Sequence, residues 1–385
     1  MKVNELTKKT LRWCEPFGGW SKLNINHDYF VVNLANGDTG LCNRILHWEL
    51  AYYINKYNDD KYNILLDSRD WPELAMITLP NTYGDYKSNK VEDAMFPLDY
   101  DKLRFKTVFD IEKDKTYQAT KLDRKKINTL FKSGDLTLED DHYYSDFGYS
   151  PIYKKMFLHK NFKSDWDNSK FMRPLTKIKL SHSYIDNLIK EGVENTVGIH
   201  MRRFNGVKTD DISLNNLKDK KLKEVYNKIS KSKTVNDNYE FFGDDVYFYI
   251  IEKMLNHNPQ QNFYISHDLP DVFLEPYIKR FGDRIVDRKF FTLPVVSHLQ
   301  AQGLNIEQLR RDGNVINNII DLFALAYCPF LITHGDSTWS EFAQYYNNEN
   351  GMKPIMPINS EVSDIIQKYI DTDAIIKPKK LPKLL

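Results

Sequence analysis

The second half of the chain alternates short apolar runs with helical patterns, and this alternation restricts the possible folds more than any other feature. The runs at residues 197–201, 262–266, 284–287 and 330–333 have the length and apolar content of buried strands. Parallel strands need such helical connections, because the chain must return from the carboxyl end of one strand to the amino end of the next. This half is therefore predicted to be an α/β fold built on a parallel sheet.

The length of the chain predicts more than one domain. With 385 residues it exceeds the size at which single hydrophobic cores stop growing, roughly 250–300 residues. A strand at 29–34, a glycine loop, a helix and a strand at 62–67 begin a first α/β region. We expect an N-terminal acceptor-side domain over residues 1–180, a second α/β domain over 181–360, and a closing helix and tail over 361–385.

Composition excludes several classes of protein. The 54 basic residues nearly equal the 53 acidic ones, which argues against a nucleic-acid-binding protein. We find no apolar run near the ~18–20 residues of a membrane span and no signal peptide at the N-terminus. The three cysteines suit a reducing compartment and have no zinc-site spacing. We therefore expect a cytoplasmic protein without a metal site.

Two adjacent arginines follow the apolar run at 197–201. Ligands of open α/β sheets bind beyond the carboxyl ends of the strands, which is where these arginines are expected. Arginine suits a phosphate because its planar fork meets two oxygens and keeps its charge. Successive side chains on a strand face opposite sides, so we place Arg202 with His200 on the ligand side and leave Arg203 for structure or the acceptor. The alternative is a strand whose exposed end is merely basic.

A glycine loop could bring backbone N–H groups close to an anion in the first half of the chain. It follows the strand at 29–34 and ends at Gly40, and a helical pattern begins near Asn43 and Arg44. Those two side chains would lie in the first helical turn. The alternative is a loop that only turns the chain.

The turn after the run at 330–333 is a second candidate anion site. Ser337 and Thr338 would stand at a helix N-terminus, where backbone amides favour negative charge. Thr338 and Glu341 have the spacing of a capping box. A capped helix without a ligand is the alternative.

Acidic residues need a separate explanation. Asp321 lies in an otherwise apolar helix at about 314–328, and an unpaired buried carboxylate is costly. It either faces solvent or accepts hydrogen bonds from a ligand, and the sequence leaves both open. The acidic run from 135 to 146 is interpreted as a solvated loop, so no metal is assigned to it.

Taken in order, these segments resemble the fucosyltransferase superfamily, which includes the α1,6-fucosyltransferases, the nodulation fucosyltransferases and the protein O-fucosyltransferases. His200-Met201-Arg202-Arg203 looks like the family's His-x-Arg-Arg motif. The stretch at 321–337 is similar to its donor-binding motif, and the loop at 40–44 is similar to its N-terminal glycine loop. Residues 263–268 resemble the strand that ends in an acid between the two main motifs.

The resemblance implies a GT-B glycosyltransferase with two Rossmann-like domains facing a cleft. It also implies transfer of fucose from GDP-fucose to a glycan or other hydroxyl acceptor, with inversion and without a metal or cofactor. Arg202 would be catalytic, gripping the β-phosphate and stabilising charge on the departing GDP. His200 and Asp321 would recognise guanine and ribose, and Ser337 would hold the diphosphate. The implied donor-binding residues are His200, Arg203, Asp321, Ser337, Thr338, Asp268, Gly40, Asn43 and Arg44.

One departure from the family pattern keeps alternatives open. Phe204-Asn205 stand where the α1,6 and nodulation enzymes carry an acid, so the support of the arginine and the subfamily are not fixed. The chain could instead use another nucleotide sugar, or bind a glycan or nucleotide without catalysis. No general base is singled out, and the candidates near the motifs are Asp38, Asp210, Asp211 and Asp268.

Overall fold

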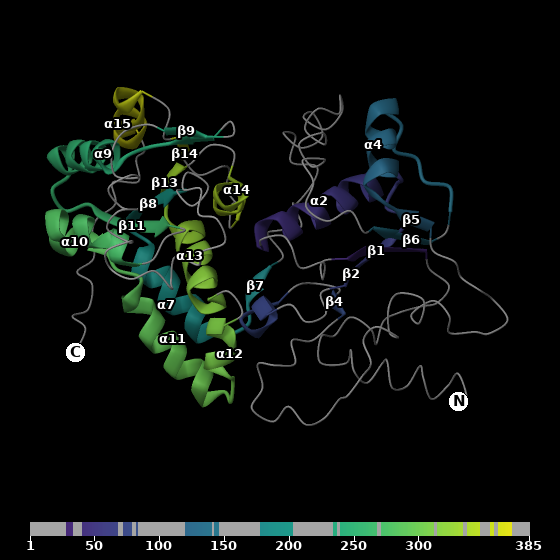
Figure 1. Ribbon diagram of the computed structural model, residues 1–385, viewed down its shortest axis with the longest axis horizontal. Helices are drawn as coiled ribbons and strands as arrows, with labels where there is room; N and C mark the ends of the chain where they lie inside the picture. Colours follow the sequence, from purple (N-terminus) through teal and green to yellow (C-terminus); the bar gives the residue numbers. More distant parts are fainter. Residues whose placement is uncertain are drawn as a thin grey trace. The chain divides into compact units, whose positions relative to one another are not determined.

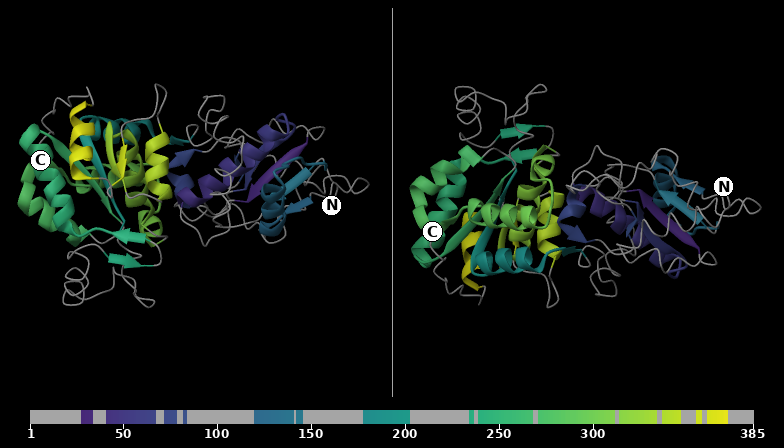
Figure 2. Two further views of the ribbon diagram at one scale, coloured as in Figure 1. Left: turned by 90° about the horizontal axis from the view of Figure 1, so that it is seen from above. Right: turned by 90° about the horizontal axis from the view of Figure 1, so that it is seen from below.

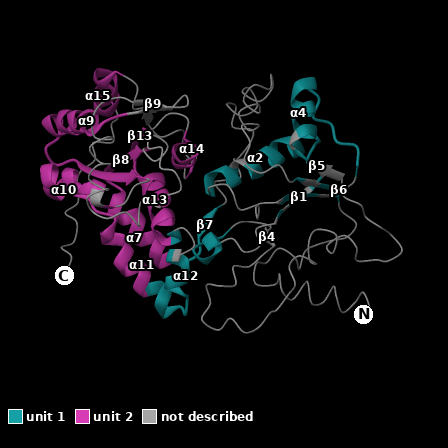
Figure 3. Ribbon diagram, viewed as in Figure 1, with its two compact units in different colours: residues 1–182, 298–315 teal, residues 183–297, 316–385 magenta. Residues whose placement is uncertain are grey.

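The computed structural model describes residues 28–33, 41–67, 72–78, 82–83, 120–140, 142–145, 178–202, 234–236, 239–267, 271–311, 314–333, 337–346, 355–357 and 361–371. The chain divides into two compact units (Figure 3). Unit 1 contains Met1–His182 and His298–Val315, and unit 2 contains Ser183–Ser297 and Ile316–Leu385. The predicted contiguous ranges need two corrections. Residues 298–315 join unit 1, and the closing helix is part of unit 2 rather than a separate segment.

Unit 1 is built on a five-stranded sheet in which every pairing is parallel. The spatial order is β4 (Thr82–Tyr83), β2 (Asn63–Asp67), β1 (Tyr29–Asn33), β6 (His142–Ser145) and β5 (Thr120–Leu122). Helix α2 (Leu41–Tyr57) follows β1 and buries most of its length, because apolar residues such as Ile45 and Trp48 recur at helical spacing. A short antiparallel pair joins β3 (Ile77–Thr78) to β7 (Lys179–Leu180).

Helix α4 (Arg124–Ser133) connects β5 to β6 and has clear end signals. The carboxylate of Asp123 accepts a hydrogen bond from the backbone N–H of Lys126 at 2.9 Å, as an N-cap does. Gly134 ends the helix with φ of 72°, a left-handed conformation that favours glycine. The helix therefore has a defined start and end despite its charged sequence.

Unit 2 is built on a second five-stranded parallel sheet (Figure 1). Its order is β12 (Ile285–Val286), β11 (Asn262–His267), β8 (Thr196–Met201), β13 (Phe330–Thr333) and β14 (Ile355–Pro357). The three central strands are buried along almost their whole length, as expected for a parallel sheet covered on both faces. The predicted α/β class with parallel strands is confirmed in both halves of the chain.

Helices cover both faces of the sheet in unit 2 (Figure 2). One face contacts α9 (Asp244–His257), α10 (Glu275–Phe281) and α15 (Val362–Asp371), whose apolar residues form a core with alternate residues of β8, β11 and β13. The opposite-facing residues of β8 include Gly198, where an added Cβ would lie 2.7 Å from Leu331 and 3.0 Å from Cys328. Helices α7 (Ser183–Val193), α11 (Lys289–Ala301) and α13 (Val315–Tyr327) complete this half of the chain, with Cys328 directly after α13.

Some segments differ from what their sequence pattern favours. The pattern at 71–77 favours a helix, but these residues form the 3-10 helix η3 (Pro72–Ala75) and then β3, which pairs with β7. The pattern at 80–175 is irregular apart from a strand-like run at 103–109, yet this region contains β5, α4 and β6. The run at 103–109 and a lysine-rich helical pattern at 217–233 lie outside the described residues. Among the described helices, none is long and apolar enough to span a membrane.

Candidate functional site

The carboxyl ends of β8 and β13 meet at a point where the sheet of unit 2 reverses its direction of growth. From β8 the chain continues to β11 and β12 on one side, and from β13 it continues to β14 on the other. In open α/β sheets, ligands bind in the crevice outside such a switch point. The residues that follow these two strands are therefore the first place to look for a site.

His200 joins the end of β8 to the helix that follows β13. Its side chain is only 5% exposed, and its Nδ1 atom lies 2.8 Å from the hydroxyl oxygen of Ser340. Ser340 is in the first turn of α14 (Thr338–Tyr345). The hydrogen bond brings the tip of β8 and the N-terminus of α14 together, although the two residues are 140 positions apart in the sequence.

Arg202 directly follows β8 and is half-buried. Met201, the last residue of the strand, packs in the apolar core and pairs with His267 of β11. That Arg202 shares the face of His200 rests on the alternation of side chains along a strand and stays a prediction. Arg203 lies outside the described residues.

The N-cap of helix α14 lies one residue earlier than predicted. The N-cap is Ser337, with φ of −91° and ψ of 120°, and Thr338 is the first helical residue. The predicted capping box of Thr338 and Glu341 is therefore wrong in register. The Ser337 side chain makes no capping hydrogen bond within the described helix. The first N–H groups of any helix lack partners within that helix, so this end can accept an anion.

Trp339, in the first turn of α14, was not anticipated from the sequence. Its indole Nε1–H is buried and has no acceptor among the described residues. A buried N–H usually finds a partner, because leaving it unpaired is costly. A donor that lacks an acceptor at this helix end is a second feature compatible with an anionic ligand.

Asp321 has partners inside the protein, a result that matches neither of the two predicted options. The residue is 3% exposed, and its carboxylate accepts hydrogen bonds from the Tyr264 hydroxyl and the Arg288 guanidinium. Arg288 also forms an ion pair with Asp271, whose side chain is partly exposed. The predicted need for a partner is thus met by Tyr264 and Arg288. The predicted role of Asp321 in guanine recognition stays a prediction.

The ionisation of this buried network follows from its surroundings. Burial raises the pKa of Asp321, and the positive charge of Arg288 offsets part of that effect. Burial also disfavours the charged form of Arg288, but its interactions with Asp321, Tyr264 and Asp271 together outweigh burial and raise the Arg288 pKa. Burial, with the nearby Asp321 charge, holds the pKa of Tyr264 well above its ordinary value. We conclude that the guanidinium stays charged and the phenol stays neutral.

Sequence reasoning missed Arg288 because its main partner is 33 residues away. Its position two residues after the short strand β12 is the one local signal that could have pointed to it.

In unit 1, the predicted residues Asn43 and Arg44 lie in the first turn of α2 and are half-buried. The Nη1 atom of Arg44 lies 4.0 Å from Oε2 of Glu73. Burial lowers the pKa of Arg44, and the negative charge of Glu73 opposes that effect. One turn later, Nε2 of the buried His47 lies 3.1 Å from the hydroxyl of Ser145 at the carboxyl end of β6. This histidine–serine contact, which sequence reasoning missed, ties α2 to the switch point of the unit 1 sheet.

The His200–Ser340 hydrogen bond joins the end of β8, which Arg202 follows, to the first turn of α14, and Ser337 and Thr338 stand at the start of that helix. Asn43 and Arg44 lie in the first turn of α2 in unit 1. The donor-binding roles of these residues stay predictions. The remaining predicted donor-site residues, Gly40, Arg203 and Asp268, lie outside the described residues. The same holds for Asp38, Asp210 and Asp211, the other candidates for a general base. The predicted cleft between the two domains stays a prediction.

Comparison with solved structures finds fucosyltransferases. The fucosyltransferase NodZ from Bradyrhizobium is 13% identical, with a TM-score of 0.39, and the match covers 83% of this chain and 93% of that one. A mutant of Arabidopsis thaliana FUT1 in complex with GDP is 11% identical, with a TM-score of 0.44 and coverages of 89% and 73%. POFUT1 in complex with GDP-fucose is 8% identical, with a TM-score of 0.39 and coverages of 88% and 99%.

The structure is similar to fucosyltransferases. No family model matches the sequence, and the search of curated proteins finds no match either. The functional interpretation rests on the geometry of the site.

Proposed function

We propose that this chain is an inverting, metal-independent glycosyltransferase that transfers fucose from GDP-fucose to a glycan or other hydroxyl acceptor. The observation that carries the proposal is the hydrogen bond between His200 and Ser340. It joins the strand end that carries Arg202 to the first turn of α14, at the switch point of a parallel sheet. The identity of the donor follows from the motif resemblance.

The proposed chemistry needs stabilisation of a leaving diphosphate. When the bond between the sugar carbon and the phosphate oxygen breaks, its electron pair stays on the β-phosphate. Arg202 and the free N–H groups at the start of α14 would stabilise that charge, because fixed donors act where the charge develops. The Ser337 hydroxyl can donate to another phosphate oxygen. The acceptor hydroxyl would attack the opposite face of the sugar carbon and lose its proton to a base, which inverts the configuration.

Calorimetry with GDP tests this function. The experiment uses the full chain in EDTA, so that any binding measured is independent of divalent metal. Arg202→Ala should weaken GDP binding about 10- to 100-fold, since a charged hydrogen bond contributes about 1.5–3 kcal/mol. Arg310→Ala, on the exposed side of α12 (Ile306–Arg311), is the matched control and should not change the affinity. Equal GDP affinity and equal sugar transfer in Arg202→Ala and wild type would contradict the proposal.

A second candidate function is transfer from a different nucleotide sugar. The internal pairing of Asp321 favours it, because the carboxylate expected to read guanine already accepts hydrogen bonds from Tyr264 and Arg288. Affinities for GDP, UDP, ADP, CDP and TDP, measured side by side, separate the two candidates. A clear preference for GDP supports the first candidate, and tighter binding of another nucleotide supports the second.

A further inference from the structure

Unit 1 contains a pocket that is independent of the donor-side residues. Its volume is about 590 Å³, within the range of about 300–1,000 Å³ that is typical of small-ligand sites. It lies between α4 and the segment at 135–140 that leads into β6. Residues of both elements line it, and all of the lining residues are among those that the structure describes.

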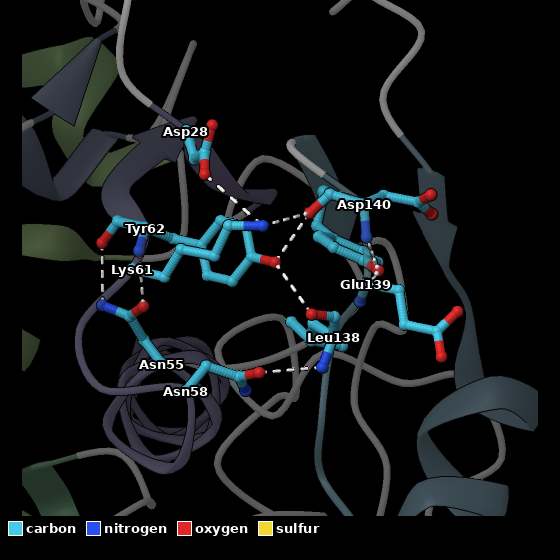
Figure 4. A network of polar contacts seen from close by, with 9 residues as sticks. Asp28, Asn55, Asn58, Lys61, Tyr62, Leu138, Glu139 and Asp140 are labelled. Carbon is cyan, nitrogen blue, oxygen red and sulfur yellow. Dashed lines mark hydrogen bonds and ion pairs between the residues drawn. The ribbon is translucent and has the colours of Figure 1, made fainter.

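The segment that forms one wall is held by side chains from other elements (Figure 4). The amide side chain of Asn58 donates to the Leu136 carbonyl at 2.9 Å and accepts from the Leu138 N–H at 2.8 Å. The Tyr62 hydroxyl donates to the Asp140 carbonyl at 2.7 Å. The wall is therefore fixed before any ligand arrives, which lowers the entropic cost of binding.

The backbone N–H groups of this wall are already used. The N–H groups of Glu139 and Asp140 donate to the Tyr143 hydroxyl at 3.0 Å and 2.9 Å, and the Thr137 N–H donates to the Asp135 carboxylate. An extended peptide that pairs through its backbone would need free N–H groups here. The hydrogen-bond donors that a ligand meets in this pocket therefore come from side chains rather than from these backbone N–H groups.

The side chains offer both kinds of hydrogen-bonding group around an apolar base. Lys125, Lys126 and Thr129 on α4 supply donors, and Glu139 and Asp140 on the opposite wall carry exposed carboxylates. Figure 4 shows both carboxylates directed away from the contacts that hold the segment. The base of the pocket includes the buried residues Leu122, Leu138 and Tyr143.

A hydroxyl group matches this rim, because it can donate to a carboxylate and accept from a lysine at the same time. A pyranose ring carries several hydroxyls at its edge and an apolar C–H face that suits the base of the pocket. A polyanion does not match, since three carboxylates, including that of Asp123, surround the two lysines.

We propose that this pocket is a carbohydrate-binding subsite that takes one or two units of a neutral oligosaccharide. The binding itself is independent of the donor chemistry. That the saccharide is part of the acceptor rests on the proposed function.

The test is direct binding to the full chain, measured by saturation-transfer NMR and calorimetry. The probes are neutral oligosaccharides of two to six units built from glucose, mannose, galactose or N-acetylglucosamine, with a heparin fragment and an acidic peptide as comparisons. Thr129→Trp fills the pocket from an exposed helix position, and Lys132→Trp places the same ring on α4 outside the pocket. Circular dichroism checks that both variants are folded.

We expect at least one neutral oligosaccharide to bind, with affinity reduced about tenfold or more in Thr129→Trp and unchanged in Lys132→Trp. Lys126→Ala and Glu139→Gln should each weaken the same interaction. The proposal is overturned if the wild type binds none of the oligosaccharides, if Thr129→Trp binds as tightly as wild type, or if only the heparin fragment or the peptide competes for the pocket. GDP affinity measured on the same wild-type sample shows separately whether the proposed function stands.

Discussion

His200 occupies a strand position where an apolar residue would be easier to bury. Its neighbours along β8, Ile199 and Met201, belong to the apolar core on the other face of the sheet. A buried polar ring is costly unless it is hydrogen-bonded, and the bond to Ser340 supplies its partner. We infer that this histidine fixes the distance between the tip of β8 and the start of α14.

A double-mutant cycle measures the coupling between these two residues. His200→Leu and Ser340→Ala should each weaken GDP binding about tenfold, because either change removes the hydrogen bond that joins the tip of β8 to the start of α14, and such a bond contributes about 0.5–1.5 kcal/mol. The double variant should bind about as well as either single variant. Full additivity of the two effects would show that the contact does not organise the site.

Substitutions in the ion pair of Asp321 and Arg288 are expected to change the stability of the protein rather than its affinity for GDP. Asp321→Asn should lower the free energy of unfolding by about 3–5 kcal/mol, because the buried Arg288 charge loses its buried counter-charge and keeps only the partly exposed Asp271. The double variant Asp321→Leu with Arg288→Met should be less destabilised than Asp321→Asn alone. Asp271→Asn is the control and should lower the free energy of unfolding by at most about 1 kcal/mol, because the Asp271 side chain is partly exposed. Urea unfolding measures all of these variants.

These residues differ in how visible they are in the sequence. His200 and Arg202 could be predicted because they end an apolar strand, and the sheet topology then places them at a ligand-binding edge. The partners Ser340 and Arg288 could not be predicted, because their contacts join positions far apart in the sequence. The internal pairing of Asp321 was missed for the same reason.

At the scale of elements, close packing around β8 depends on a position without a side chain. Gly198 lies beside Leu331 of the neighbouring strand and Cys328 at the end of α13. A Cβ there would be 2.7 Å from the Leu331 side chain, a distance that forces atoms to move. The strand that carries the site is thus held closely against its neighbours.

Gly198→Ala tests this packing. It should lower the free energy of unfolding by about 1–3 kcal/mol, the usual cost of overpacking a core. Leu331→Val removes the atom that would clash, so adding it to Gly198→Ala should cost less than the sum of the single changes. Urea unfolding of the two single variants and the double variant gives the comparison. Simple additivity would mean that Leu331 is not the limiting contact.

The strands and helices of unit 2 could largely be predicted, because apolar runs and helical spacing reflect burial directly. Helix α4 was missed because its apolar stripe is short, consisting of Ile127, Leu130 and Phe131 within a charged region. Its further signals were Asp123 and Gly134, the residues that cap its two ends. A search for caps together with apolar spacing would have found it.

At the scale of the whole molecule, a second piece of chain completes unit 1. The segment His298–Val315 belongs with Met1–His182, and no local pattern marks this association. His182 and His298, which end and begin these pieces, contact each other with ring nitrogens 3.4 Å apart. The contact holds the two pieces of unit 1 together where the chain leaves and re-enters it.

This histidine pair predicts a pH dependence of stability. Burial lowers the pKa of His182 below 6.5, the charge of His298 acts in the same direction, and the hydrogen bond with the Ala75 backbone opposes both. The unfolded chain therefore takes up a proton at a higher pH than the folded chain does. Stability that is present above pH 6.5 should be lost as the pH falls through the folded pKa.

Urea unfolding at pH 7.5 and at pH 5.5 measures this effect. The stability difference between the two pH values should be smaller in His182→Gln than in wild type. Tyr184→Gln, at an exposed position of α7, is the control and should keep the wild-type difference. An unchanged pH dependence in His182→Gln would contradict the assignment to this residue.

The interleaved order of the two units has a consequence for synthesis. A ribosome that has released the first 182 residues has not yet made the piece at 298–315 that finishes the same unit. Unit 1 therefore stays incomplete while residues 183–297, which belong to unit 2, are synthesised. Expression of the first 182 residues alone should therefore yield an incomplete unit 1 rather than an independently folded domain.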